Sequence, residues 1–126
     1  MPKNPIGWFE VYVNDLDRAK TFYESVFEVS LESIGDPNDS SIQMLAFPSD
    51  MERYGATGAL VKMDHVLAGG GGTLVYFACD DCAIEEARVT TAGGSIQRPK
   101  MDIGEYGFIS LVVDSEGNMI GLHSMT

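Results

Sequence analysis

Alternating and helical hydrophobic patterns follow one another along the chain and predict a protein of mixed α and β structure. At 8–13, apolar and polar residues alternate with a period of two, which is typical of a strand with two different faces. Residues 16–27 then carry apolar side chains at helical spacing, and Asp15 precedes them as a candidate N-cap. Three further strands are predicted at 28–33, 42–47 and 58–63.

The second half of the chain repeats this order of elements. A strand at 73–79 leads into a helical pattern that opens at Asp80 and Asp81 and stops at Gly93. A short strand at 95–97 and longer ones at 108–113 and 119–124 follow. Aligning the two strand-to-helix junctions places Val11 on Phe77 and Asp15 on Asp81, so the order strand, helix, strand, strand, strand occurs twice.

The repeat predicts a single α+β domain over residues 1–126, built from two βαβββ modules. Module one covers about 6–66 and module two about 73–124, and the glycines at 69–72 form a flexible joint between them. One module alone would leave one face of its sheet bare, whereas pairing two modules closes a ligand cavity between them.

Composition and charge narrow the classes of partner. The 126 residues include 19 acidic and 8 basic side chains, a formal net charge of -11, which repels nucleic-acid backbones and anionic membrane surfaces. The sequence contains no run of 18 apolar residues, which a membrane span needs, and no apolar segment near its start, which a signal peptide needs. We therefore expect a cytoplasmic protein with a small-molecule ligand, and neither nucleic acid nor membrane as a partner.

Three segments of the chain resemble the vicinal oxygen chelate superfamily, which includes glyoxalase I, bleomycin-resistance proteins and extradiol dioxygenases. They are residues 9–23, residues 75–81 and residues 114–122, where Asp-Ser-Glu-Gly-Asn stands in place of the family's Asp-Pro-x-Gly-Asn turn. The resemblance covers nearly the whole chain. It implies a U-shaped mixed sheet with the helices on its outer face, a concave ligand cavity and a homodimer.

The metal-dependent members of that family bind a divalent cation through one position on the first strand and one on the last strand of each module. By the resemblance, the first-strand positions fall on Trp8 and Leu74. The last-strand positions fall on Gly121 and near Ala59 or Leu60. None of these side chains carries the oxygen or nitrogen donor that such cations need. We expect no metal at this site and no other cofactor.

If Trp8 and Leu74 face the cavity, strand alternation places Glu10, Tyr12 and Tyr76 there too and turns Phe9, Val11 and Phe77 toward the helices. The same argument places alternate residues of the last strand inside. The loop that carries Tyr106 fits either a position over the cavity mouth or a solvated turn. The predicted ligand-binding residues are Trp8, Tyr12, Leu74, Tyr76, Tyr106, Met119 and Gly121. This lining suits an aromatic or partly apolar molecule.

Glu10 and His123 are the candidate catalytic residues, because a carboxylate among apolar side chains and an imidazole can both exchange a proton near neutral pH. Three hypotheses stay open. The first is a metal-independent isomerase or lyase. Lactoylglutathione lyase activity is not expected, because the metal ligands are missing. The second is a non-catalytic protein that sequesters a cationic aromatic compound, and the third is a silent regulatory dimer module.

Cys79 and Cys82 form a Cys-x-x-Cys sequence at a strand-to-helix junction, where redox pairs and zinc ligands also occur. Cys79 occupies a helix-facing position equivalent to Val13, and the two intervening aspartates oppose thiolate formation. The buried apolar interpretation is therefore favoured over a redox or zinc role.

Overall fold

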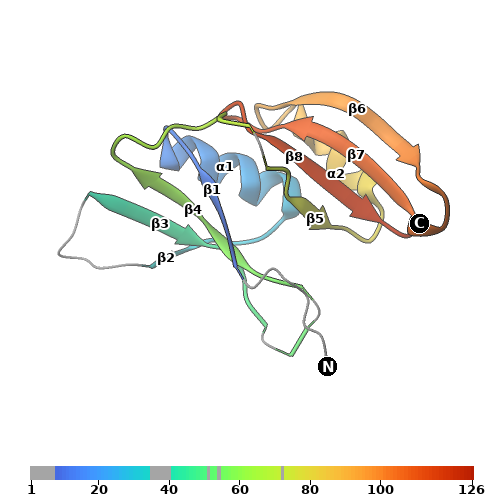
Figure 1. Ribbon diagram of the computed structural model, residues 1–126, viewed down its shortest axis with the longest axis horizontal. Helices are drawn as coiled ribbons and strands as arrows, with labels where there is room; N and C mark the ends of the chain where they lie inside the picture. The colour runs from blue at the N-terminus through green and yellow to red at the C-terminus, as the bar shows by residue number, and fades with distance from the viewer. Residues whose placement is uncertain (1–7, 35–40, 51, 54, 72) are drawn as a thin grey trace.

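Two βαβββ modules follow one another along the chain (Figure 1). The computed structural model describes residues 8–34, 41–50, 52–53, 55–71 and 73–126. Module one contains β1 (Phe9–Tyr12), α1 (Leu16–Phe27), β2 (Glu32–Ile34), β3 (Ile42–Ala46) and β4 (Gly58–Met63). Module two contains β5 (Tyr76–Ala78), α2 (Cys82–Val89), β6 (Ser95–Asp102), the 3-10 helix η1 (Gly104–Tyr106), β7 (Phe108–Val113) and β8 (Met119–Ser124). The predicted α+β fold with a repeated βαβββ order is confirmed.

Each module has a four-stranded mixed sheet with the same strand order. The orders are β1-β4-β3-β2 and β5-β8-β7-β6. The first strand of each module along the chain pairs in parallel with the last one, β1 with β4 and β5 with β8. Glu10 pairs with Ala59 in the first sheet, and Tyr76 pairs with Gly121 in the second. These two pairs occupy equivalent places, so the register shows the internal repeat directly.

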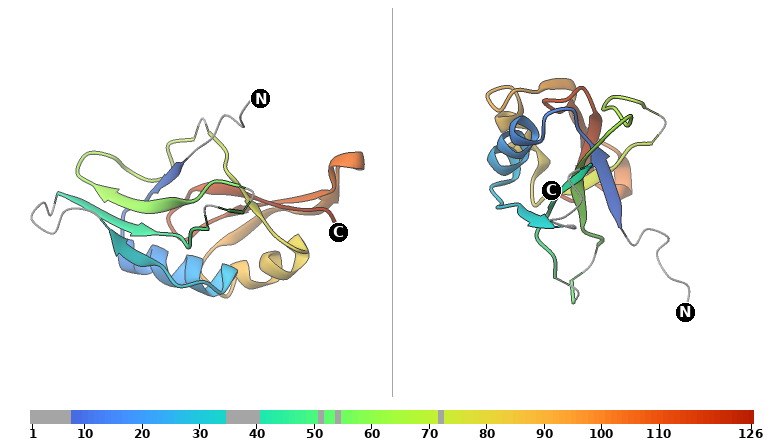
Figure 2. Two further views of the ribbon diagram at one scale, coloured as in Figure 1. Left: turned by 90° about the horizontal axis from the view of Figure 1, so that it is seen from below. Right: turned by 90° about the vertical axis from the view of Figure 1, so that its left-hand side faces the viewer.

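Both helices lie on the same side of the two sheets (Figure 2). α1 begins where the Asp15 carboxylate accepts a hydrogen bond from the Arg18 backbone N–H, at 3.0 Å. Asp81 caps α2 in the same way through the Ala83 N–H, also at 3.0 Å. In the part of the chain that the structure describes, no helix is long and apolar enough to cross a membrane.

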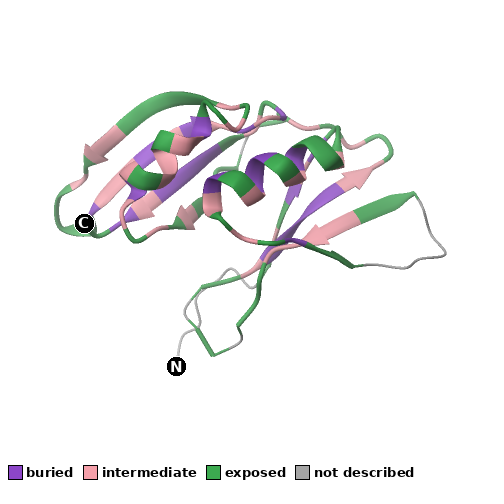
Figure 3. Cartoon of the chain, turned by 180° about the vertical axis from the view of Figure 1, so that it is seen from behind, coloured by how far each residue is buried: buried purple, intermediate pink, exposed green. Residues whose placement is uncertain are grey.

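The core lies between the helices and the sheets, on the face where the sequence pattern predicted it (Figure 3). Phe22 and Tyr23 of α1 are fully buried against Val11 and Leu60, and Ile120 and Leu122 of β8 belong to the same core. Phe77 of β5 extends this core across the modules. Its ring centroid lies 4.8–5.9 Å from four aromatic rings of module one, those of Phe9, Tyr23, Phe27 and Phe47. The modules therefore share one aromatic core.

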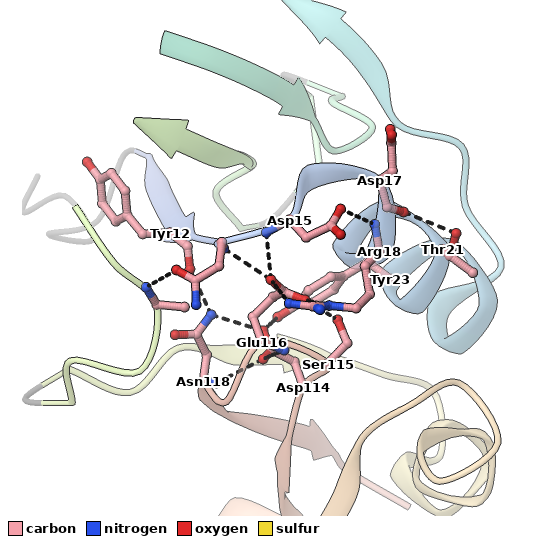
Figure 4. Close-up of polar contacts among 12 residues, drawn as sticks. Tyr12, Asp15, Asp17, Arg18, Thr21, Tyr23, Asp114, Ser115, Glu116 and Asn118 are labelled. Carbon is pink, nitrogen blue, oxygen red and sulfur yellow. Dashed lines mark hydrogen bonds and ion pairs between the residues drawn. The ribbon is translucent and has the colours of Figure 1, made fainter. Parts of the chain in front are cut away.

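A buried carboxylate from module two joins the two modules. The Glu116 side chain, which has no exposed surface, accepts hydrogen bonds from the backbone N–H groups of Asn14 and Asp15 at 3.0 and 2.8 Å. It also accepts from the Arg18 Nε and Nη2 at 2.6 and 2.9 Å, and from the Ser115 hydroxyl at 3.0 Å (Figure 4). Burial alone would raise the pKa of Glu116, but these donors outweigh it and lower the pKa to about 2.

Glu116 belongs to the turn at 114–118, and other residues of this turn bind module one and the glycine joint. The Tyr23 hydroxyl donates to Asp114 Oδ2 at 2.6 Å, and burial together with the Asp114 charge raises the pKa of Tyr23 well above its usual value. The Asn118 amide donates to the Tyr12 carbonyl at 2.9 Å and accepts from the Gly69 N–H at 2.6 Å. The glycine joint, expected to be flexible, is therefore tied at its first residue; Gly72 lies outside the described residues.

The element boundaries differ from the sequence prediction in both modules, and α2 (Cys82–Val89) is shorter than the helical pattern from Asp80 to Gly93. α1, β4, β7 and β8 have the predicted bounds, whereas β2 and β5 are shorter than expected. β6 is longer, because Pro99 does not end the strand. β6 lies at the sheet edge and its pairing with β7 shifts register twice between Ile96 and Met101, which accommodates a residue without an N–H donor.

Glu116→Gln is expected to lower the free energy of unfolding by about 2 kcal/mol near neutral pH, because it leaves buried donors poorly matched. Because the pKa of Glu116 is lower in the folded protein than in the unfolded chain, its ionised carboxylate stabilises the fold at pH values above the unfolded-state pKa. This stability is lost as the pH falls toward about 2. The variant should therefore lose less stability on acidification than the wild type does. Urea unfolding at a series of pH values measures both effects.

The exposed ion pair of Arg53 with Asp50, 3.3 Å apart, provides the control. Arg53→Gln should change stability by less than about 0.5 kcal/mol. A Glu116→Gln protein as stable as the wild type at every pH would contradict this account of the junction.

Candidate functional site

A carboxylate held between two aromatic side chains lies on the sheet face of module one that is turned away from the helices. Glu10 Oε1 accepts a hydrogen bond from the Tyr12 hydroxyl at 2.7 Å, and Glu10 Oε2 accepts one from the Trp8 indole N–H at 3.2 Å. Trp8 is 44% exposed, and Glu10 is exposed as well. We call Trp8, Glu10 and Tyr12 the carboxylate box.

Strand alternation produces this arrangement. Phe9, Val11 and Val13 point into the helix-facing core, so the residues between them project from the opposite face, which we call the concave face. The hydrogen bond to Glu10, followed by burial and the negative charge of Glu10, raises the pKa of Tyr12. Tyr12 therefore stays a protonated donor at physiological pH and fixes one oxygen of Glu10.

Strand pairing extends the same face across the sheet. Ala59 pairs with Glu10, Ala46 pairs with Ala59, and Glu32 pairs with Ala46, so two small residues separate two carboxylates along one row. Glu32 is exposed on the edge strand β2. Sequence reasoning did not identify Glu32 as a neighbour on this face, because only the cross-strand register reveals it.

In module two, an aromatic ring stands where module one has Glu10. Tyr76 pairs with Gly121, and a Cβ built on Gly121 would lie only 2.2 Å from Tyr76 Cδ1. The ring therefore covers the Gly121 backbone on the concave face. Leu111 pairs with Gly121 on the other side, and Arg98 pairs with Leu111. Arg98 and Leu111 are further neighbours that sequence reasoning missed.

The remaining predicted site residues all belong to module two. Leu74 and Met119 are exposed, and Tyr106, in η1, is 68% exposed. His123 lies on β8, the strand between β5 and β7, and its Nε2 is 2.7 Å from the Tyr106 carbonyl oxygen. This contact joins the predicted loop residue to the predicted imidazole.

Glu10 and His123 are not brought together by the contacts of the described residues. Glu10 bonds to Trp8 and Tyr12 within module one, whereas His123 bonds to Tyr106 within module two. The sheets that carry them are separate in hydrogen bonding over the described ranges. A proton relay between the two groups within one chain therefore has no geometric support.

The two cysteines form no disulfide with each other and lie toward the core. Cys82 is fully buried at the start of α2, and Cys79 is half-buried. Burial and the nearby Glu85 carboxylate raise the pKa of Cys79 to about 12, so this thiol carries almost no thiolate at neutral pH.

The four positions that hold the metal in metal-dependent relatives carry no ligating side chains. Trp8 and Leu74 stand just before β1 and β5, and Ala59 and Gly121 pair with Glu10 and Tyr76, two residues further along the chain. The Tyr76 ring also fills the space directly above Gly121. Across the described ranges, no three histidine, cysteine, aspartate or glutamate side chains converge as a metal-binding group. The residues present do not fit the family's metal.

Native Cys79 and Cys82 are expected to react with Ellman's reagent more than about a hundredfold more slowly than in the unfolded chain, because one is protonated and the other is inaccessible. The measurement follows thiol release at neutral pH with and without urea. Rapid reaction of either thiol in the folded protein, or formation of a disulfide between them, would show that the pair is reactive.

Metal analysis of the purified protein after incubation with Ni²⁺, Zn²⁺, Mn²⁺ or Fe²⁺ is expected to find well below one ion per chain, since the donor side chains are missing. The ion content is measured by mass spectrometry after gel filtration. One ion per chain, lost on substitution of Glu10 or His123, would overturn the argument from the ligand positions.

Comparison with known proteins identifies the family. The sequence profile of the Glyoxalase/Bleomycin resistance protein/Dioxygenase superfamily matches residues 5–122. The chain is 26% identical over 118 residues to the putative glyoxylase CFP32 of Mycobacterium bovis, a match that covers 92% of this chain and 44% of the relative. The chain thus spans less than half the length of this curated relative.

Solved structures share the fold at low sequence identity. Glyoxalase I from Zea mays superposes with a TM-score of 0.73 and 22% identity, over 93% of this chain and 43% of that chain. A glyoxylase/bleomycin resistance protein/dioxygenase domain from Frankia sp. gives a TM-score of 0.70 and 13% identity, over 98% of both chains. This chain belongs to the Glyoxalase/Bleomycin resistance protein/Dioxygenase superfamily, because the family profile matches residues 5–122 and the structure has the repeated βαβββ modules.

Proposed function

We propose that this protein binds a small cationic, partly aromatic molecule on its concave face, without a metal, and that it sequesters this ligand rather than transforming it. The carboxylate box carries the proposal. Each oxygen of Glu10 already accepts a hydrogen bond from an aromatic side chain, and the three groups remain accessible on one face. A negative charge fixed beside aromatic rings is the chemistry that recognises an organic cation.

The energetics favour a cation on this face. An ammonium group over Trp8 or Tyr12 would gain about 0.5–2 kcal/mol from the ring quadrupole, in addition to its attraction to Glu10. Glu32, on the same row, adds a second negative charge, and the net charge of -11 raises the local concentration of cations. Because Trp8 and Tyr12 already hold Glu10 in place, little side-chain freedom is lost on binding.

The catalytic alternative is a metal-independent isomerase or lyase that moves a proton with Glu10 and His123. It has less support, because these groups lie in separate sheets and share no contact among the described residues. Both Glu10 oxygens also accept bonds within the box, and His123 is bonded to the Tyr106 carbonyl. Sequestration needs only the box itself.

We also propose that the protein works as a homodimer. Large apolar side chains stand exposed on the concave faces, among them Ile34, Ile42 and Met119. A second copy that covers part of these faces would remove apolar surface from water and make the ligand site more enclosed. A silent dimer module, the third hypothesis, would share this surface but bind no ligand.

A thermal-shift series with N-methylquinolinium and benzyltrimethylammonium is expected to raise the melting temperature by several degrees, since a ligand at about 100 times its Kd stabilises by about 2.7 kcal/mol. Glu10→Gln should weaken binding about tenfold, because it keeps the shape of the side chain and removes its charge. Calorimetric titration of both proteins gives the two dissociation constants.

Asp64→Asn is the matched control, because it removes one carboxylate from an exposed turn after β4. It should bind both cations within about twofold of the wild type, as expected for a screened surface charge. No binding of either cation by the wild type, or an equal loss in both variants, would contradict the role of the box.

A further inference from the structure

We infer that Tyr76 is a specificity-determining residue whose ring forms a stacking platform for a planar part of the ligand. The inference rests on the proposed function, since it assumes that small molecules bind on the concave faces. It goes further by naming a second contact, in the other module, and by selecting planar rings over saturated groups of equal charge.

The backbone of Gly121 fixes the position of the Tyr76 ring. A Cβ on Gly121 would lie 2.2 Å from Tyr76 Cδ1, 2.4 Å from Cε1 and 2.8 Å from Cγ, all below any real contact distance. Three ring carbons therefore stand directly over the Gly121 Cα, where only glycine leaves room. This contact holds the ring from below and restricts its rotation.

The ring remains accessible above this contact. Tyr76 is 46% exposed, and its hydroxyl makes no hydrogen bond among those found for the described residues. Leu111 and Arg98 continue the same row of the sheet, and the Arg98 guanidinium is 3.6 Å from Met101 Sδ. The platform is thus bordered by an aliphatic side chain and a cation, with no carboxylate in this row.

An aromatic ring over a cross-strand glycine can also serve only to stabilise a sheet. Phe9 covers Gly58 in this way, with Cγ and Cδ1 each 2.8 Å from a built Cβ, but the Phe9 ring packs against the helix-facing core. Tyr76 covers Gly121 on the opposite, concave face. The half-exposed Tyr76 ring thus keeps surface that a ligand can contact.

The internal repeat relates this platform to the carboxylate box. Glu10 with Ala59 and Tyr76 with Gly121 are equivalent pairs of the two modules. One module therefore offers a negative charge and the other a flat ring at the same place in the fold.

Calorimetric titrations with two cations of equal charge test the inference. N-methylquinolinium is planar, and N-methylquinuclidinium is saturated. In the wild type the planar cation should bind more tightly. Tyr76→Leu, which still covers Gly121 but lacks a ring, should weaken N-methylquinolinium about tenfold and leave N-methylquinuclidinium within about twofold. Tyr76→Phe should keep the planar preference, which a requirement for the hydroxyl would not allow.

Equal affinities for the two cations in the wild type, or unchanged N-methylquinolinium binding in Tyr76→Leu, would overturn the platform. If circular dichroism shows Tyr76→Leu to be unfolded, Tyr76→Met replaces it in the same comparison. Failure of the proposed function has a different signature: neither cation would bind the wild type. Neutral quinoline then tests the platform independently of charge. A tenfold lower affinity of Tyr76→Leu for quinoline supports the platform, whereas an unchanged affinity, or no binding to the wild type, overturns it.

Discussion

The arrangement of the molecule depends on one buried carboxylate. Glu116, from the turn before the last strand, satisfies the backbone N–H groups at the start of α1 and the guanidinium of Arg18. A buried charge is tolerated only where such donors compensate its lost hydration. The helix start of one module thus depends on a turn of the other, which joins the two halves through polar contacts as well as through the aromatic core around Phe77.

The same junction reaches the candidate site through Tyr12. Its backbone carbonyl accepts a hydrogen bond from Asn118 of the intermodule turn, whereas its hydroxyl donates to Glu10 in the carboxylate box. A single residue of β1 therefore connects the contact that joins the modules to the group proposed to bind the ligand. Pre-organisation of this kind lowers the entropy lost on binding and favours a preformed site over one assembled by the ligand.

The sequence predicted the fold well, because two signals agreed. Periodicity gave the bounds of α1, β4, β7 and β8, and the repeated strand-to-helix junctions gave the two modules. The strand at 95–97 was predicted too short. β6 continues through Pro99 because it lies at the sheet edge, where its register shifts accommodate a residue without an N–H donor. Local patterns do not contain this information.

For the candidate site, alternation placed Glu10 and Tyr12 on one face but could not show that the Trp8 and Tyr12 donors bind both Glu10 oxygens. Glu32, Leu111 and Arg98 were missed, because cross-strand neighbours depend on register between segments distant in sequence. The turn at 114–118 was identified by its residues, yet its role in joining the modules depends on the tertiary partners of Glu116 and Asn118. Fold membership, in turn, does not assign a reaction, since this family carries several activities on one scaffold.

Trp8 is the single tryptophan of the chain, so its indole N–H gives one identifiable resonance in a nitrogen-15 correlation spectrum. The most direct measurement follows this resonance during titration with choline and with its uncharged isostere 3,3-dimethylbutan-1-ol. Because that N–H donates to Glu10, the account predicts a saturable shift with choline and little or none with the alcohol. No shift with choline, or equal shifts with both compounds, would contradict a cation site at Glu10.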